Sequence, residues 1–385
     1  MKLLAPSLIS WRMMTDNMGR FLLSALGVAF AVMIMFMQMG FYNGQNDSQA
    51  NLGPILDADL IISSKWKEHL KSGEEITIKR LRQALALDEV SSVTPVYTNG
   101  SYWRNPQDSS RNRVLVIAVS LDNPGISTPE IKKYKDRLRL PGAVLYDRLS
   151  RKELGEVKIG TRTQLKGEPV TVVGLFELGP NMAYEGNVII SHENFYRIYS
   201  DWGGAERVAD QISLGMIKLK KGADPLAVRE KLKAQLPDDF ITHTPDEIYE
   251  REKTYTAKHS PGGIVFGIGL NVAFIIGVII CYQILFNEVQ DHLPQFATLK
   301  AIGHRTGYIF GIVVNDALIL SLAGFIPGLA GSWLLYKALA HLTQLVFFLT
   351  PARIGLILGL TTVMCLLSAA FAMYKLIAAD PADLY

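Results

Sequence analysis

Four long stretches without charged side chains constrain this chain more than any other feature of its sequence. Residues 21–42, 264–286 and 354–374 contain no charged residue, and residues 308–335 contain only Asp316. A helix of about 20 apolar residues is long enough to cross the hydrocarbon core of a bilayer. The sequence therefore predicts an α-helical membrane protein with four transmembrane helices.

The long segment between the first two stretches, residues 43–261, has the pattern of a large α+β domain. Short β-branched runs bounded by Gly, Pro, Asn and Asp predict strands, and the runs between them have helical spacing. The layers could form one or two subdomains. The predicted strands include residues 60–62, 114–119 and 170–175, and the predicted helices include residues 78–87, 147–154 and 225–236.

A capping box marks the end of this domain. In Thr244-Pro245-Asp246-Glu247, a threonine at the cap is followed by proline in the first turn and by glutamate three residues on. This pattern begins a helix, because the two side chains satisfy free backbone amides reciprocally. The helix is expected to lead toward the second span.

The charges in short loops indicate the orientation of the spans, because cytoplasmic loops are enriched in Lys and Arg. One set of loops holds Lys2, Arg12, Arg20, Lys300, Arg305 and Lys375, and the single short loop opposite holds Lys337 and Arg353. This bias favours both termini in the cytoplasm. The first span is followed by Asn43-Gly-Gln-Asn-Asp and by no small-residue cleavage site, so it is interpreted as an uncleaved signal anchor.

The expected organisation follows from these boundaries. The segments are 1–20 (cytoplasmic amphipathic helix), 21–42 (first span), 43–261 (external α+β domain), 262–286 (second span), 287–306 (cytoplasmic segment), 307–336 (third span), 337–353 (short external loop), 354–377 (fourth span) and 378–385 (cytoplasmic tail). In the first segment one apolar helical face is expected to lie on the membrane surface, formed by Leu4, Leu8, Trp11, Met14 and Met18.

The sequence carries no recognisable catalytic motif. The dipeptide Gly-Lys occurs nowhere, so the chain has no Walker A phosphate loop. His192-Glu193 lacks the second histidine of a zincin and is interpreted as a solvated turn before a helix at Asn194. We therefore expect no enzymatic activity, cofactor, metal or nucleic acid. The two cysteines, Cys281 and Cys365, lie in spans as small lipid- or helix-facing residues.

The third span carries polar and small residues that need a partner. Asp316, with Asn315 beside it, lies about two turns from the cytoplasmic end, where pairing with Lys300 or Arg305 would satisfy it; a proton-relay role is the alternative. Small residues and a proline farther along the span predict close helix packing and a kink, namely Gly324, Pro327, Gly328 and Gly331.

The segment after the second span, Asn287 to Arg305, has more structure than a plain loop requires. Pro294 should end or bend the second span, and a helical pattern follows from Gln295 to a stop at Gly303. Either a soluble partner or the lipid surface could cover its apolar side chains. The residues that would contact a partner are Asp291, Gln295, Phe296, Leu299, Lys300, Ile302 and Gly303, with Phe296 and Leu299 as the expected apolar anchors.

The chain resembles the FtsX/MacB superfamily of permeases of ABC transporters. Gln295-Phe-Ala-Thr-Leu-Lys-Ala-Ile-Gly303 is similar to the family's E-I/F-G/A-x-L-R/K-A-I/M-G stretch, except that Gln295 replaces the usual glutamate. Further similarities are the runs from Gly142, Ile159 and Gly167 in the large domain and the ending Asp380-Pro-Ala-Asp-Leu-Tyr385. Asp291-His-Leu-Pro294 resembles more narrowly the DevC-type permeases of cyanobacteria.

The resemblance implies a permease subunit that hydrolyses no ATP itself. Residues 295–303 would be the coupling helix that receives the motion of separate cytoplasmic ATPase subunits, which bind ATP and Mg²⁺. The family further implies a homodimer in a bacterial, here cyanobacterial, inner membrane, a periplasmic membrane-fusion adaptor and a TolC-like outer-membrane channel. Such systems export lipid-like or hydrophobic substrates by mechanotransmission. For DevC-type permeases the implied substrate is a glycolipid. An FtsX-like signalling relay that activates a periplasmic partner is the alternative function.

Overall fold

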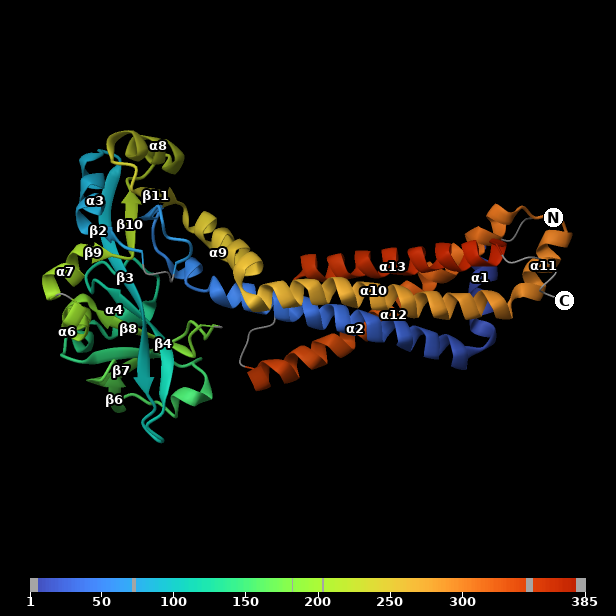
Figure 1. Ribbon diagram of the computed structural model, residues 1–385, viewed down its shortest axis with the longest axis horizontal. Helices are drawn as coiled ribbons and strands as arrows, with labels where there is room; N and C mark the ends of the chain where they lie inside the picture. The colour runs from blue at the N-terminus through green and yellow to red at the C-terminus, as the bar shows by residue number, and fades with distance from the viewer. Residues whose placement is uncertain (1–5, 71–73, 182, 203, 344–348, 379–385) are drawn as a thin grey trace. The chain divides into compact units, whose positions relative to one another are not determined.

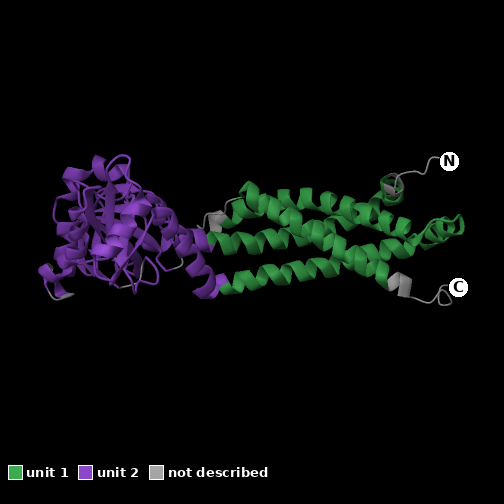
Figure 2. Cartoon of the chain, turned by 90° about the horizontal axis from the view of Figure 1, so that it is seen from above, with its two compact units in different colours: residues 1–44, 264–343, 347–385 green, residues 45–263, 344–346 purple. Residues whose placement is uncertain are grey.

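The computed structural model describes the chain except for residues 1–5, 71–73, 182, 203, 344–348 and 379–385. The chain divides into a helical unit, residues 1–44, 264–343 and 347–385, and a larger unit, residues 45–263 and 344–346 (Figure 2). Residues 379–385 of the expected tail, with its terminal motif, and residues 344–348 of the expected short loop lie outside the described residues.

The helical unit is a bundle of long apolar helices. Four described helices are long and apolar enough to cross a membrane, and the large domain is inserted between the first two of them. Their long axes run side by side, and two short helices lie together at one end of the bundle (Figure 1). The long helices are α2 (Met18–Gln49), α10 (Pro261–Asp291), α12 (Thr306–Thr343) and α13 (Pro351–Ala378), and the short ones are α1 (Pro6–Asp16) and α11 (Leu293–Ala301).

Small residues of α12 allow it to approach α2 closely. A Cβ at Gly324 would lie 2.5 Å from the Cβ of Val28, and one at Gly328 would lie 2.8 Å from the Cβ of Val32. Both valines are fully buried. In membranes such close approach gives helices the dispersion contacts that hold them together. The contact expected of these glycines is thus made within one chain.

The two cysteines face each other between α10 and α13. Cys281 and Cys365 are fully buried, and their Sγ atoms lie 3.8 Å apart as free thiols. They pack as small side chains between helices, which is one of the two environments predicted for them.

The larger unit is built on a nine-stranded mixed sheet and a separate two-stranded one, β2 with β9. The order in the main sheet is β11-β1-β10-β3-β4-β8-β5-β7-β6. The strands are β1 (Leu60–Ser64), β2 (Ile76–Thr77), β3 (Val90–Arg104), β4 (Arg111–Val119), β5 (Ala143–Asp147), β6 (Arg162–Leu165), β7 (Glu168–Phe176), β8 (Gly186–Ser191), β9 (Gln211–Ile212), β10 (Leu214–Leu219) and β11 (Phe240–His243).

The long strand β3 joins the two halves of the sheet. Its first half, from Val90 to Val96, pairs with β10, and its second half, from Tyr97 to Arg104, pairs with β4. Trp103 near its end also pairs with Leu165 of β6, which brings the far edge of the sheet back to β3. One continuous strand therefore runs through what could have been two subdomains.

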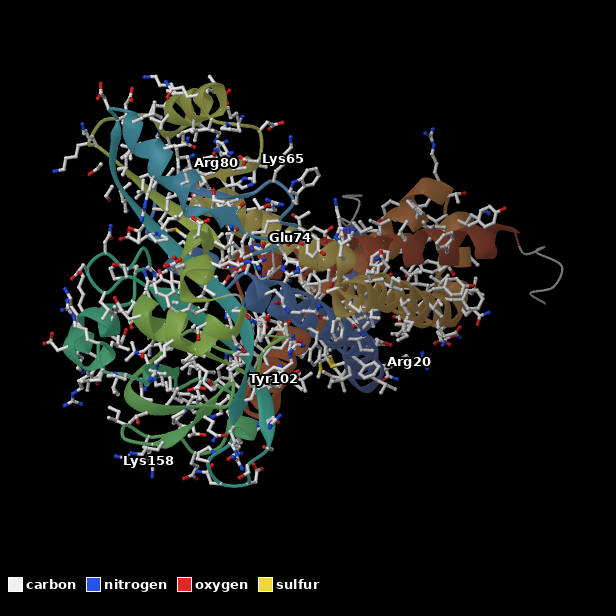
Figure 3. The ribbon with its side chains drawn as sticks, turned by 60° about the vertical axis from the view of Figure 1, so that its left-hand side comes forward. Arg20, Lys65, Glu74, Arg80, Tyr102 and Lys158 are labelled. Atoms are coloured by element: carbon white, nitrogen blue, oxygen red, sulfur yellow. The ribbon has the colours of Figure 1, made fainter. Side chains whose placement is uncertain are left out.

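Short helices cover the faces of this sheet around two apolar cores. The α-helices are α3 (Ile78–Gln83), α4 (Pro129–Lys133), α5 (Lys135–Leu138), α6 (His192–Tyr199), α7 (Ala205–Asp210), α8 (Pro225–Gln235) and α9 (Pro245–His259). The 3₁₀ turns are η1 (Gly53–Ile55), η2 (Ala84–Ala86), η3 (Lys152–Leu154) and η4 (Ser200–Trp202). At the α8 end of the sheet, Lys65 and Arg80, labelled in Figure 3, pair with Asp238 and Asp239.

Several local predictions are confirmed. The three predicted strands fall within β1, β4 and β7, and the helix predicted from residue 225 is α8. The capping box is present: the Thr244 hydroxyl accepts from the Glu247 amide at 3.3 Å, and the Glu247 carboxylate accepts from the Thr244 amide at 2.9 Å. It begins α9, which ends at His259, so that only Ser260 separates it from Pro261.

Two local predictions are wrong, both because buried polar side chains find distant partners. Residues 147–154 form no α-helix, since the carboxylate of Asp147 accepts hydrogen bonds from the amides of Leu149 and Gly179, which hold the chain in a turn. His192 is not solvated. Ser191 caps α6, and the imidazole of His192 packs edge-on against Tyr97, 5.0 Å between ring centres.

Candidate functional site

The short helix α11 is the candidate site, and its two ends are set by proline and glycine. The preceding helix α10 ends at Asp291, and Pro294 occupies the first turn of α11, where an amide is not needed. At the other end Gly303 has a φ of +104°, and its amide donates to the Lys300 carbonyl at 3.0 Å. A left-handed glycine of this kind ends helices. The predicted break and stop are confirmed, with Leu293 inside the new helix.

One face of α11 packs against the helical bundle of its own chain. Phe296 is only 5% exposed and belongs to the apolar core formed by the long helices. Leu299, one turn later, is half-buried against the same core. Both side chains thus hold α11 on the bundle, and their expected role as anchors for a separate partner stays a prediction.

A second face of α11, beside the buried one, is open. Gln295, Thr298 and Ile302 follow one another at spacings of three and four residues, so they share one side of the helix. All three are exposed, and Ile302 exposes 66% of its surface. Lys300 is also exposed. The free face thus combines an amide, a hydroxyl and one bare apolar side chain.

An ion pair and a carboxylate–imidazole contact lie beside α11. Asp291 at the end of α10 pairs with Arg20 in the first turn of α2, and both side chains are about half exposed (Figure 3 labels Arg20). One turn earlier, a carboxylate oxygen of Glu288 lies 3.3 Å from Nε2 of His292, the residue between α10 and α11. These contacts fix the end of α10 from which α11 starts.

The buried carboxylate of α12 has a partner that was not predicted. Asp316 is 3% exposed and accepts a hydrogen bond from the hydroxyl of Ser10 on α1, not from Lys300 or Arg305. Asn315 donates to the Gly311 carbonyl of its own helix at 2.8 Å. Of the predicted apolar face of α1, Met14 is buried, and Trp11 and Met18 are each 52% exposed. Leu4 lies outside the described residues, and the membrane-surface role of this face stays a prediction.

The arrangement makes α11 a surface element rigidly connected to the long helices. Phe296 and Leu299 link it to the core, and the chain continues from it directly into α10 and α12. The open face of α11 is therefore connected through the chain to two long helices, α10 and α12.

Two family comparisons identify the chain. The FtsX-like permease C-terminal family matches residues 267–381, a range that contains α11, α12 and α13 and most of α10. The MacB-like periplasmic core domain family matches residues 21–235, which is more than half of the chain. The chain belongs to the FtsX/MacB superfamily of ABC transporter permeases.

A curated relative supports this assignment. The FtsX/MacB permease described here is 23% identical over 191 residues to an uncharacterized ABC transporter permease of Methanocaldococcus jannaschii. The match covers 48% of this chain and 46% of the relative, so the chain spans about half the length of the curated protein that it matches.

Solved structures of MacB-like domains are similar at a low level. The periplasmic region of MacB from Actinobacillus actinomycetemcomitans is 14% identical, with a TM-score of 0.34, covering 51% of this chain and 92% of that one. The extracellular domain of the noncanonic ABC-type transporter YknZ from Gram-positive bacteria is 11% identical, with a TM-score of 0.32, covering 49% and 99%. Scores this low add nothing to the family assignment.

In this FtsX/MacB permease, the structure brings together only part of the predicted site. Phe296 and Leu299 face inward, Gln295 and Ile302 face outward, and Asp291 is engaged by Arg20. Sequence reasoning missed Ser10 and Arg20 as partners. The sequence indicated only that the carboxylate of Asp316 needs a donor, and this need does not identify Ser10 as the partner.

Proposed function

We propose that the chain is the permease subunit of a MacB-type, DevC-like exporter in a bacterial inner membrane. Its open α11 face docks on a separate cytoplasmic ATPase subunit, and both chain termini lie on the same side of the membrane. Residues 43–261 lie in the periplasm. Two copies form the permease, and a periplasmic adaptor and an outer-membrane channel complete the export path. ATP and Mg²⁺ bind to the ATPase.

One observation carries the coupling role: α11 has a buried face and an open face. The buried face, through Phe296 and Leu299, joins the helix to the bundle. The open face leaves Ile302 bare beside the exposed Gln295, Thr298 and Lys300, so a partner that docks on this face would bury the isoleucine. Membership in the FtsX/MacB superfamily supports an ATPase as the partner.

The substrate is a lipid-like or hydrophobic molecule taken from the periplasm or the outer leaflet. The MacB-like core domain supports export by mechanotransmission, in which motion of α11 and the long helices changes the periplasmic domain. A glycolipid is the finer proposal, by resemblance to DevC-type permeases.

The coupling proposal is tested on the open face. Ile302→Ala and Ile302→Glu should each reduce stimulation of the ATPase in proteoliposomes and its retention in a pull-down. A hot-spot side chain contributes about 2 kcal/mol, which corresponds to a loss of affinity greater than tenfold. Gln295→Glu, which restores the usual family residue, should retain full binding.

The matched control is Ile159→Ala, which truncates a half-exposed isoleucine in the large unit. It should leave stimulation unchanged. If both Ile302 variants stimulate and bind the ATPase like the parent protein, α11 is not the docking element.

The orientation of the chain in the membrane has its own test. A cysteine at Gln164 should react with an impermeant maleimide in intact spheroplasts, and a cysteine at Gln295 should not. The opposite labelling pattern would overturn the proposed topology.

A further inference from the structure

The larger unit contains a polar pocket of about 360 Å³ that the coupling role does not use. Ligand pockets in proteins have volumes of about 300–1,000 Å³, so this one suits a small group such as a lipid head group. It lies within one unit, and its lining is formed by Gln49, His69, Arg113, Ala183, Tyr184, Glu252, Tyr255, Thr256, His259 and Ser260.

Part of the lining comes from the two segments that adjoin the candidate spans in sequence. Gln49 is the last residue of the long helix α2, and His259 and Ser260 directly precede Pro261, where α10 begins. The two segments are tied together, since the Gln45 amide donates to the Ser260 hydroxyl at 2.5 Å. A ligand held here is therefore one turn of chain away from the start of a candidate span.

The charges that line the pocket favour an anion. Arg113 is exposed, and its guanidinium lies 5.3 Å from the centre of the Tyr184 ring. None of the ion pairs in the described part of the chain includes Arg113. Guanidinium groups bind phosphate and carboxylate through two parallel hydrogen bonds. Arg113 is thus held in place with its charge available.

The single carboxylate in the lining is already engaged. Glu252 is 4% exposed, and its Oε1 accepts from the Leu70 amide at 2.7 Å. The buried ammonium of Lys67 also lies within its electrostatic reach. The lining offers a cationic ligand no second carboxylate, whereas it offers an anionic ligand the guanidinium of Arg113.

A row of rings supplies the remaining wall. The Tyr255 ring lies between two imidazoles, with centre distances of 5.2 Å to His69 and 4.5 Å to His259. The Tyr255 hydroxyl donates to Glu68 at 2.9 Å, which fixes the ring. The hydroxyls of Thr256 and Ser260 provide further donors to an anionic oxygen, whereas Nδ1 of His259 donates to the Tyr255 carbonyl at 3.1 Å.

We propose that this pocket binds the anionic head group, phosphate or carboxylate, of an amphiphile whose tail remains in the membrane. Arg113 on β4 holds the anionic oxygens, and the imidazole of His259 contacts them from the end of α9. The role of this pocket as a substrate site rests on the proposed export function. Binding of the amphiphile to the pocket requires neither the ATPase nor an adaptor.

Binding is measured on the purified full-length permease in a neutral detergent, by isothermal titration calorimetry. The probes are dihexanoyl phosphatidic acid, dihexanoylglycerol with the same tails but no charge, and inorganic phosphate. We expect phosphatidic acid to bind at least tenfold more tightly than dihexanoylglycerol and than phosphate alone. Equal binding of dihexanoylglycerol would refute an anion site, and equal binding of inorganic phosphate would refute an amphiphile site.

Arg113→Gln removes the charge and keeps a polar side chain. Because a hydrogen bond to a charged group contributes about 1.5–3 kcal/mol, the affinity for phosphatidic acid should fall about tenfold or more. His259→Gln should give a smaller loss. The matched control is Arg111→Gln on the same strand, an exposed arginine outside the lining, which should leave the affinity unchanged.

The outcomes separate this proposal from the coupling role. If Arg113→Gln and His259→Gln both bind phosphatidic acid like the parent protein, or if Arg111→Gln weakens binding as much as Arg113→Gln does, the pocket is not the site. In either case Ile302→Glu still reports on the ATPase contact, because Ile302 belongs to the other unit. Conversely, a failed coupling test leaves the calorimetric result standing.

Discussion

Removing the hydroxyl of Ser10 should release the N-terminal helix α1 from the bundle. Ser10 is fully buried and donates to the carboxylate of Asp316, which is itself 3% exposed. Among the side chains of α1 that the structure describes, Met14 is also buried, at 5% exposure, and Met13 packs against the same core, whereas Trp11 is half exposed. The hydrogen bond of Ser10 therefore adds a polar contact to this apolar packing.

The expected size follows from the chemistry of the pair. A hydrogen bond to a charged acceptor contributes about 1.5–3 kcal/mol, and in Ser10→Ala the buried carboxylate would lose this donor as well. If α1 detaches by local opening, amide exchange over Pro6–Asp16 should accelerate by about 10- to 150-fold. Exchange in α13, which holds neither partner, should stay unchanged.

Hydrogen–deuterium exchange with peptide-level mass spectrometry on the permease in detergent measures this directly. Asp316→Asn is the informative comparison, because its amide oxygen still accepts from Ser10, and the acceleration should be smaller than in Ser10→Ala. The reasoning is refuted if Ser10→Ala leaves exchange in Pro6–Asp16 at the parent rate. It is equally refuted if exchange rises by the same factor in α13, since that would report general unfolding.

Three further outcomes test other parts of the structure. Leu26 is 59% exposed on α2, and Val32 is fully buried. In the proposed dimer a cysteine at Leu26 should therefore form a crosslink between subunits, and one at Val32 should not. Absence of crosslinks at every exposed α2 position would contradict an α2 interface. Gly328→Leu should lower the melting temperature in detergent, because overpacking costs about 1–3 kcal/mol, whereas Gly311→Leu, with nothing within 4 Å, should not. Burial lowers the pKa of His192 from 6.5 to about 4, so between these pH values the unfolded chain binds more protons than the folded one. The free energy of unfolding of the domain should therefore fall by up to about 3 kcal/mol as pH falls from 6.5 to 4. An equal fall in His192→Gln would contradict this origin.

Local features of the fold could be predicted from the sequence because their causes are local. Uncharged apolar runs are sufficient to mark the long helices, and Pro294 and Gly303 mark the ends of α11. The Thr244–Glu247 box begins α9 because both partners lie within one turn. None of these inferences requires knowledge of a distant residue.

Long-range contacts escaped prediction for a corresponding reason. Ser10 and Asp316 are 306 positions apart, and either could have paired with many other groups. The same holds for Asp147, whose carboxylate binds the side chain of Asn187, 40 positions away, and so holds a turn where helical spacing predicted a helix. A buried polar group indicates that a hydrogen-bond partner exists, but which residue is the partner depends on the fold.

The burial of Phe296 separates it geometrically from Ile302. An α-helix turns about 100° per residue, so Phe296 and Ile302 lie about 120° apart around the axis of α11 and cannot share a narrow face. Grouping both with Leu299 merged two different surfaces: one that the bundle covers and one that stays open. With the faces separated, Phe296→Ala is no longer a probe of docking, since it removes core packing. Ile302 becomes the position at which a loss of coupling can be assigned to the partner contact rather than to the fold.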